Sequence, residues 1–240
     1  MYDYKNSKSN IINILSSKTK IEKTEIISKG GEFKYENGIR AWVGAIFVDI
    51  VNSQKLFKSD DEKTVKIMRA FTSEIITIFQ DIATYDRIGV YGDCIYAICG
   101  AQLQENLGDI FETACQTNTF LKMFNKILEK EKYKAIDAGI GLGCSESLVI
   151  DAGITGEGIN DRIWISRAVS DAARLAKTAN RKKIGSIAMS RDFYDNIIDI
   201  LLEEDPEYKE WITYDSINSF YHCNITQYDF NLWVNKGMKE

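Results

Sequence analysis

The stretch AWVGAIFVDI, residues 41–50, is a continuous apolar run of strand type that ends at Asp49-Ile50. A run without polar alternation is typical of a strand that is buried on both faces. The stretch DRIGVYGDCIYAIC, residues 86–99, predicts a hairpin with strands at 87–91 and 94–99 around the turn Gly92-Asp93. Because a helical pattern separates the two stretches, they indicate a split βαβ arrangement.

The rest of the chain extends this arrangement. Apolar residues recur at spacings of three and four over 62–82 and 106–129, which predicts two amphipathic helices. Later segments predict two strands within 135–156 around a turn at 144–147, a helix at 166–178, a strand at 185–190, a helical turn at 191–198 and one or two strands within 219–234. The predicted fold class is α+β: a ferredoxin-like split βαβ with a mixed sheet, helices on one face and extra C-terminal strands.

The two ends of the chain differ in character. Residues 1–40 are polar and rich in Lys, Ser, Asn and Glu, which predicts an N-terminal extension, partly helical around 11–15 and ending at the turn Gly30-Gly31. We expect residues 41–240 to form one domain, in keeping with a total length of 240 residues.

Composition excludes several classes of protein. The chain is 45% hydrophobic and 27% charged, as ordinary globular proteins are, and its formal net charge is −5. Mild acidity argues against nucleic acid as a partner, since broad nucleic-acid binding needs a basic footprint. No apolar run reaches the length of a membrane span or of a signal-peptide core, so we expect a cytoplasmic protein without a membrane segment.

Cysteine and histidine usage narrows the chemistry. The five cysteines are odd in number and lack CxxC spacing, which predicts reduced core thiols rather than a zinc ribbon or a disulfide framework. His222 is the only histidine in the sequence, so a metal site must consist mostly of carboxylates.

Two aspartates occupy special places in the predicted sheet. Asp49 ends the first strand, and Asp93 sits on the hairpin turn. If the strand lies beside the hairpin, both carboxylates lie at one edge, where they form the oxygen ligand set that Mg²⁺ or Mn²⁺ prefers. Two such ions would act as a clamp for displacement at phosphorus. The alternative is that each aspartate is an ordinary turn residue.

Two further segments suggest phosphate chemistry. The loop that contains Asn52 and Ser53 follows the first strand and offers backbone N–H groups to phosphates, although an ordinary strand–helix connection is the simpler interpretation. Ser170 and Arg174 are four residues apart and share one helix face. An arginine there suits charge building on a phosphoryl group; alternatively it is solvated and pairs with a neighbouring aspartate.

Two features are open to both a structural and a functional interpretation. The basic run Arg181-Lys182-Lys183 predicts a solvated helix C-terminus, with a phosphate contact left open. Trp164, flanked by isoleucines, suits either the core or the wall of a base pocket.

The motifs FVDIxxSxxL at 47–56, YGDCIYAI at 91–98 and SxAVSDAARLA at 166–176 together resemble class III nucleotidyl cyclases over residues 41–195. The resemblance implies that Asp49, Asp93 and the carbonyl of Ile50 hold two Mg²⁺ or Mn²⁺ ions per active site. It implies that Arg174 contacts the ribose and triphosphate in the transition state. Ser170 stands where the family usually has Asn.

The base-reading positions depart from the purine cyclases of that family. Gly89 replaces the usual Lys or Glu four residues before Asp93, and Ile163 replaces the second polar reader. With the short chain, these departures resemble the pyrimidine cyclases of Pycsar anti-phage systems. That resemblance implies conversion of UTP, or alternatively CTP, to a 3′,5′-cyclic monophosphate and pyrophosphate, the product being read by a separate effector protein. Gly89, Tyr91 and Trp164 are candidates for substrate contact by position.

The resemblance also implies a homodimer with composite active sites, in which the aspartates come from one subunit and Arg174 from the other. Two alternative functions stay open: a purine cyclase with an unusual base pocket, and a catalytically silent module that binds a nucleotide and regulates a partner. Retention of both Asp49 and Asp93 argues against the silent module.

Overall fold

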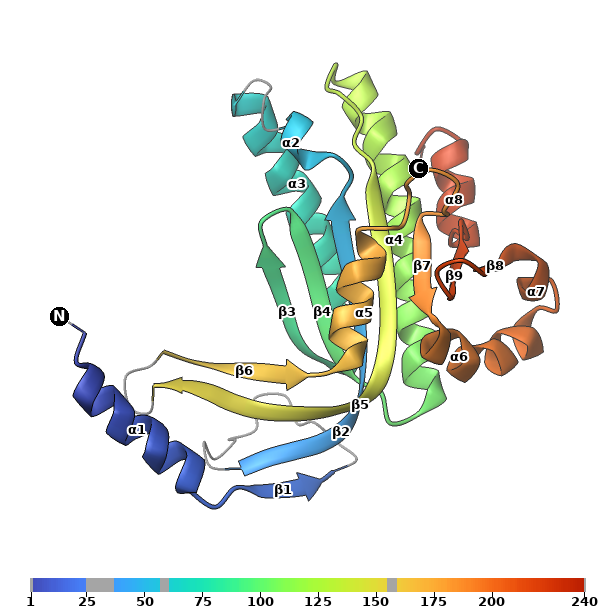
Figure 1. Cartoon of the computed structure of the whole chain (residues 1–240). Helices are drawn as coiled ribbons and strands as arrows, with labels where there is room; N and C mark the ends of the chain where they lie inside the picture. The colour runs from blue at the N-terminus through green and yellow to red at the C-terminus, as the bar shows by residue number, and fades with distance from the viewer. Residues whose placement is uncertain (1, 25–36, 57–60, 155–158, 240) are drawn as a thin grey trace.

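A mixed sheet lies at the centre of the computed structural model, which describes residues 2–24, 37–56, 61–154 and 159–239 (Figure 1). The strands of this part of the chain are β1 (Lys20–Lys23), β2 (Asn37–Ile50), β3 (Tyr85–Tyr91), β4 (Cys94–Gly100), β5 (Ala138–Ile154), β6 (Ile159–Ile165), β7 (Ile187–Ser190), β8 (Thr213–Asp215) and β9 (Phe220–Cys223). Their order is β3-β4-β2-β5-β7-β9-β8, while β1 pairs with β2 and β6 pairs with β5.

Strand β2 lies between β4 and β5 in the sheet. It pairs antiparallel with β4 on one side and with β5 on the other, and β3 and β4 form the predicted hairpin. The order β3-β4-β2-β5 is that of a split βαβ unit, so this part of the prediction is confirmed.

Helices lie on both faces of the sheet. The helices of the described part of the chain are α1 (Tyr4–Ser16), α2 (Ser53–Leu56), α3 (Asp61–Gln80), α4 (Gln104–Lys130), α5 (Arg167–Ala176), α6 (Arg191–Glu204), α7 (Tyr208–Trp211) and α8 (Tyr228–Asn235). Helices α3, α4 and α6 bury the larger core against one face of the sheet. Helix α5 buries a smaller, alanine-rich cluster against the other face.

The fold class is confirmed, but the placement of all helices on one face is wrong. A Cβ atom on Gly44 would meet side chains of α4. The next residue along β2, Ala45, pairs with Gly143 of β5, and a Cβ atom on Gly143 would meet the backbone of α5. Neighbouring side chains along a strand point to opposite faces, so α4 and α5 lie on opposite sides. The apolar pattern of a helix shows that it has a buried side, not which face of the sheet it covers.

Close backbone contact seats α5 on β5. Gly139, Gly141 and Gly143 alternate along β5, and a Cβ on any of them would collide with a backbone carbonyl of α5. The facing residues of α5 are buried alanines. Because neither element has a long side chain at this contact, the helix is held directly against the strand.

Three segments differ from the prediction. Residues 144–147 are not a turn: they lie inside β5 and pair with β2, and the hydroxyls of Ser145 and Ser147 lie 3.2 and 2.5 Å from Ser166 Oγ. The predicted helical turn at 191–198 extends to the 14-residue helix α6. Of the predicted late strands, β9 forms, but residues 228–235 are the helix α8.

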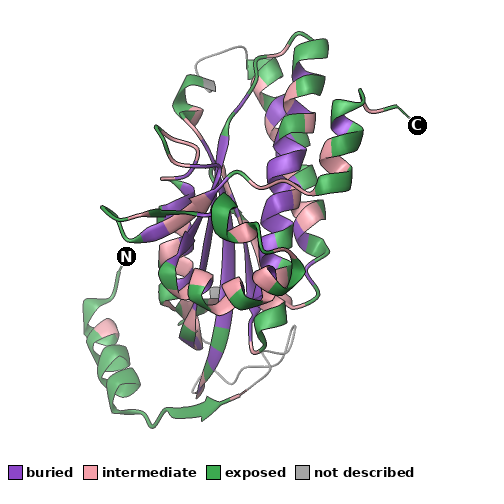
Figure 2. Cartoon of the chain, turned by 90° about the vertical axis from the view of Figure 1, so that its right-hand side faces the viewer, coloured by how far each residue is buried: buried purple, intermediate pink, exposed green. Residues whose placement is uncertain are grey.

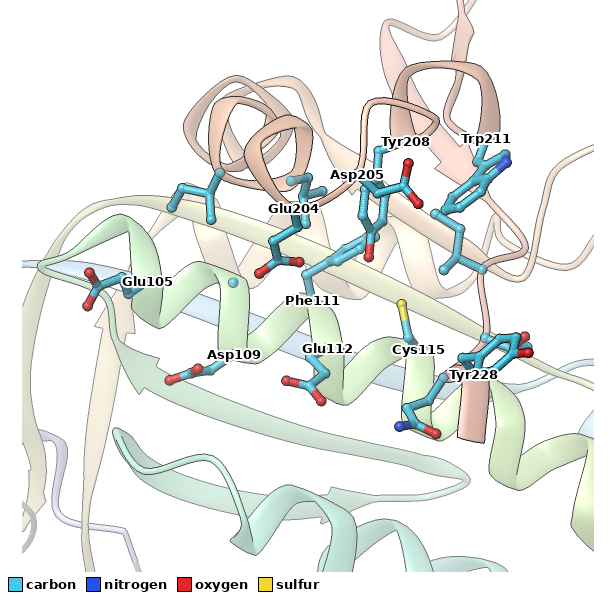
Figure 3. Close-up of a pocket in the computed structure, with 16 residues that line it drawn as sticks. Glu105, Asp109, Phe111, Glu112, Cys115, Glu204, Asp205, Tyr208, Trp211 and Tyr228 are labelled. Carbon is cyan, nitrogen blue, oxygen red and sulfur yellow. The ribbon is translucent and has the colours of Figure 1, made fainter. Parts of the chain in front are cut away.

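The N-terminal segment projects from the body. The predicted helix around 11–15 lies within α1, whose residues are solvent-exposed or nearly so, and β2 begins four residues before the predicted start of the core (Figures 1 and 2). Strand β1 pairs in parallel with the start of β2. The predicted turn Gly30-Gly31 lies outside the described residues. None of the described helices has the length and apolarity that a bilayer crossing requires.

The packing of α5 on β5 predicts a contrast between two glycine substitutions. Gly141→Ala places a methyl group against the carbonyl of Ala172, and we expect it to lower the free energy of unfolding by about 1–3 kcal/mol. Gly108→Ala, in α4, meets no atom within 4 Å, and we expect it to raise that free energy by up to about 1 kcal/mol through helix propensity. Urea denaturation of both variants measures the contrast; equal stabilities would contradict the tight contact.

Candidate active site

The two predicted aspartates lie at the end of the sheet where β2 finishes and the β3–β4 hairpin turns. We call this end of the sheet, with Asp49 and Asp93, the aspartate edge. Asp49 is paired with Cys94 across β2 and β4, and Asp93 directly precedes Cys94 in the hairpin turn. Gly92 opens that turn with a φ of 62°, a conformation that glycine adopts without strain. The sequence order therefore brings both carboxylates into one neighbourhood, as predicted.

The environment of Asp49 disfavours its negative charge. The residue is only 7% exposed. Burial raises the pKa of the Asp49 carboxyl above its ordinary value; the hydrogen bond from Arg181 opposes that rise, and the nearby charge of Asp93 reinforces it. Burial also raises the pKa of the Cys94 thiol to about 12, with both aspartates acting in the same direction. A cation between the two carboxylates would stabilise their negative charges.

The observed positive partner of Asp49 is Arg181. Its Nη2 donates to Asp49 Oδ1 at 2.8 Å, and its Nη1 donates to the carbonyl oxygens of Ala176 and Ala179 at 2.9 Å each. The positive charge of Lys177 also acts on Asp49. The expectation that the basic run 181–183 is simply solvated is therefore wrong for Arg181.

The chemistry of this site fits divalent cations with oxygen ligands. Two carboxylates at one strand edge are hard donors of the kind that Mg²⁺ and Mn²⁺ prefer. Among the described residues, no group of three or more His, Cys, Asp or Glu side chains gathers as a metal site. The protein would thus supply part of the coordination, and Mg²⁺ commonly takes the remainder from water and substrate phosphates.

The segment after Asp49 turns sharply. Ile50 is buried and still in β2, the N–H of Val51 donates to Asp137 O at 2.7 Å, and Asn52 is left-handed with a φ of 56°. Asparagine tolerates that conformation better than most residues. Ser53 then begins α2, so the predicted phosphate loop lies directly beside the aspartate edge.

An aromatic side chain covers the predicted base-reading position. A Cβ on Gly89 would collide with the ring and hydroxyl of Tyr96, its partner across β3 and β4. Tyr96 in turn stacks on Phe47, with ring centroids 5.0 Å apart and an interplanar angle of 13°. The sequence pointed to Gly89 but not to Tyr96. Tyr91, the other candidate on this hairpin, is 83% exposed next to the turn.

The predicted transition-state residues lie on the outer side of α5. Ser170 Oγ donates back to the carbonyls of Ser166 and Arg167 at 3.3 and 3.2 Å. Arg174 Nη2 lies 3.1 Å from Asp171 Oδ1, and the Arg174 side chain is half exposed. This pairing is the one that the solvated interpretation anticipated, and the single chain places Arg174 at a surface.

The structure separates Trp164 from the aspartate edge of its own chain. Trp164 pairs with Val149, which pairs with Ile39, ten residues along β2 from Asp49. The indole is half-buried, the Arg87 guanidinium lies 5.8 Å from its ring centroid, and its Nε1 is buried without a hydrogen-bond partner in the described part of the chain.

Sequence comparison identifies the family, although no family model matches the chain. A uridylate cyclase from Treponema porcinum is 36% identical over 240 residues, covering 99% of this chain and 82% of that protein. This chain belongs to the uridylate cyclase family. A second uridylate cyclase, from Gulbenkiania mobilis, is 25% identical over 251 residues, covering 98% of this chain and 97% of that protein.

Structural comparison agrees with the fold of a cyclase. The solved adenylyl cyclase CyaB from P. aeruginosa matches with a TM-score of 0.63 and 16% identity, covering 80% of this chain and 98% of that one. The chain is a nucleotidyl cyclase, as its motifs indicated.

For this member of the uridylate cyclase family, the structure groups Asp49, Asp93, Lys177 and Arg181 at one edge of the sheet. The sequence did not predict that Lys177 and Arg181 lie at this site. The visible signal was a basic run just after a motif helix, but the pairing of Arg181 with Asp49 spans 132 residues and depends on the tertiary fold.

Proposed function

We propose that this nucleotidyl cyclase converts UTP to 3′,5′-cyclic UMP and pyrophosphate, with CTP as the alternative pyrimidine substrate. The observation that carries the proposal is the 36% identity to a uridylate cyclase over nearly the whole chain. The filled space above Gly89 supports it independently, because that space is where purine cyclases place a polar base reader.

Tyr96 gives the base preference a physical basis. Its ring lies over Gly89 and is backed by Phe47, so a Lys or Glu at position 89 would need Tyr96 to move. A ring held by stacking also reduces the room beside the hairpin. A pyrimidine, the smaller base, needs less of that room than a purine.

The proposed chemistry uses the residues at the aspartate edge. Asp49, Asp93 and the carbonyl of Ile50 would hold two Mg²⁺ or Mn²⁺ ions, which lower the pKa of the ribose 3′-hydroxyl and neutralise the triphosphate when bound. The 3′-hydroxyl gives up its proton to solvent and its oxygen forms a bond to the α-phosphorus, while the bond from that phosphorus to the bridging oxygen breaks and pyrophosphate leaves. Arg174 stabilises the charge that develops at phosphorus, and Ser170 donates a hydrogen bond to the ribose.

We infer that two chains build each active site. Arg174 lies at the surface of α5 and is paired with Asp171 rather than directed at the aspartates of its own chain. In a twofold homodimer, Arg174 of one chain faces Asp49 and Asp93 of the other, and two equivalent sites result.

We infer further that cyclic UMP is a second messenger in anti-phage defence, made in the cytoplasm and read by a separate effector protein. The net charge of −5 supports a small-molecule role rather than nucleic-acid binding.

The first prediction concerns the product. Purified protein is incubated with Mn²⁺ and, separately, ATP, GTP, CTP or UTP, and the products are identified by mass. We expect cyclic UMP as the main product, reduced at least about a hundredfold in Asp49→Ala because a metal ligand is lost. Cyclic AMP or GMP as the main product would overturn the base assignment and retain the cyclase chemistry. No product from any nucleotide would favour a regulatory nucleotide-binding module.

The second prediction concerns base selection. Tyr96→Ala removes the ring above Gly89, and we expect it to lower the ratio of kcat/KM for UTP to that for ATP by about tenfold, because a larger base gains room. Tyr214→Ala is the matched control, since Tyr214 is an exposed tyrosine on β8, at the far edge of the same sheet. An unchanged ratio in Tyr96→Ala would remove Tyr96 from base selection.

The third prediction tests the composite site. Asp93→Ala and Arg174→Ala are each inactive alone, and an equal mixture regains about a quarter of wild-type activity, because half of the dimers are mixed and each has one intact site. The control mixture, Asp49→Ala with Asp93→Ala, regains nothing since both lesions fall in the same half-site. Equal failure of both mixtures would place Arg174 in the site of its own chain.

A further inference from the structure

The segment after α5 is shaped to bring one guanidinium back toward Asp49. Arg181 is flanked by Asn180 and Lys182, which both have left-handed backbones with φ values of 55° and 58°. Left-handed conformations are unfavourable for most residues other than glycine and asparagine, and at Lys182 such a conformation persists because the surrounding structure holds it. Here Asn180 is tied down through Nδ2, which donates to Ala138 O at 3.1 Å.

Arg181 uses its two terminal nitrogens for different purposes. Nη1 donates to the carbonyl oxygens of Ala176, the last residue of α5, and of Ala179, whereas Nη2 alone reaches Asp49, at 2.8 Å. Asp49 is 7% exposed, so without a cation its charge would stay uncompensated in a poorly solvated place. The arginine therefore supplies the positive charge where a metal ion is expected.

The same arginine borders a basic cavity. A cavity of about 670 Å³ is lined by ten residues, of which one, Asp215, is acidic and five are basic. Four of the basic residues are Lys177, Arg181, Lys182 and Lys183; the fifth is Arg174, which the proposed dimer assigns to the active site of the partner chain. A cavity with this excess of positive charge attracts a polyphosphate. Arg181 is thus within reach of a second anionic partner besides Asp49.

We propose that Arg181 exchanges partners during substrate binding: it neutralises Asp49 before the divalent ions arrive, and then contacts the β- and γ-phosphates of the nucleotide on the same subunit. The inference rests on the proposed function, because it takes Asp49 as a metal ligand. A divalent ion at Asp49 repels the guanidinium at short range, and the incoming triphosphate attracts it. Arg181 thus competes with the metal for Asp49 in the free protein and binds the phosphates in the complex.

The proposal predicts opposite effects of one substitution on two affinities. In Arg181→Gln without nucleotide, Mn²⁺ binding becomes about tenfold tighter, because a competing cation is gone. With saturating Mn²⁺, the same variant binds 3′-deoxy-UTP about tenfold more weakly, because a phosphate contact is gone. This analogue lacks the attacking hydroxyl, so binding is measured without turnover. Free Mn²⁺ is followed by its electron paramagnetic resonance signal and nucleotide binding by calorimetry.

Two control variants separate this proposal from the proposed function. Asp49→Asn must weaken Mn²⁺ binding; if it does not, the metal site itself is wrong and both proposals fall. Arg191→Gln removes one positive charge at the opposite end of β7, where Arg191 pairs with Asp195, and leaves both affinities unchanged.

The exchange of partners by Arg181 would be overturned if a folded Arg181→Gln chain bound Mn²⁺ no more tightly than the wild type while Asp49→Asn weakened Mn²⁺ binding. The proposed function would then still stand. If Arg181→Gln fails to fold because it loses the α5 contacts, Arg181→Lys decides. Lysine keeps the charge but not the forked donors, so Mn²⁺ binding stays near wild type while 3′-deoxy-UTP binding weakens; wild-type binding of both would overturn the proposal.

Discussion

The contact between α5 and β5 determines the geometry of the site, because it joins backbone to backbone. Three glycines on the strand and three alanines on the helix leave no flexible side chain between them. The strand also pairs with β2 along its length, from Ile50 back to Gly38. The cations of α5 and of the segment after it are therefore placed relative to Asp49 by rigid elements.

The second constraint is the burial of a carboxylate at the end of β2. A charge in such a place needs a partner, and in this chain Arg181 provides it. Asp93 adds a like charge nearby, and Lys177 adds a second positive charge. The two carboxylates would give a divalent cation two oxygen ligands, and substrate phosphates and water would supply the rest of its coordination.

The sequence was informative where chemistry is local. The apolar run that ends at Asp49 and the Gly92-Asp93 turn located the central strand, the hairpin and both aspartates. The sequence was less informative for β5, where Ser145 and Ser147 look like turn residues. They fit inside a strand because their hydroxyls bond to Ser166, at the start of α5, and this contact is visible only in the fold. The same limit applies to α5: its alanine-rich face indicates burial, but only the glycines of β5 opposite it determine which face of the sheet it covers.

The site residues divide in the same way. Asp49 and Asp93 are found by their place on a strand and a turn, whereas Arg181 and Tyr96 act through partners that only the fold supplies. Gly89 illustrates the point, because the role proposed for it depends on the Tyr96 ring, which lies where a side chain at position 89 would stand. The glycine at position 89 can be interpreted only together with the side chain that occupies the space beside it. Here an aromatic ring stacked on Phe47, two residues before Asp49, fills that space, so the proposed base selection and the proposed metal binding would both depend on the same short stretch of β2.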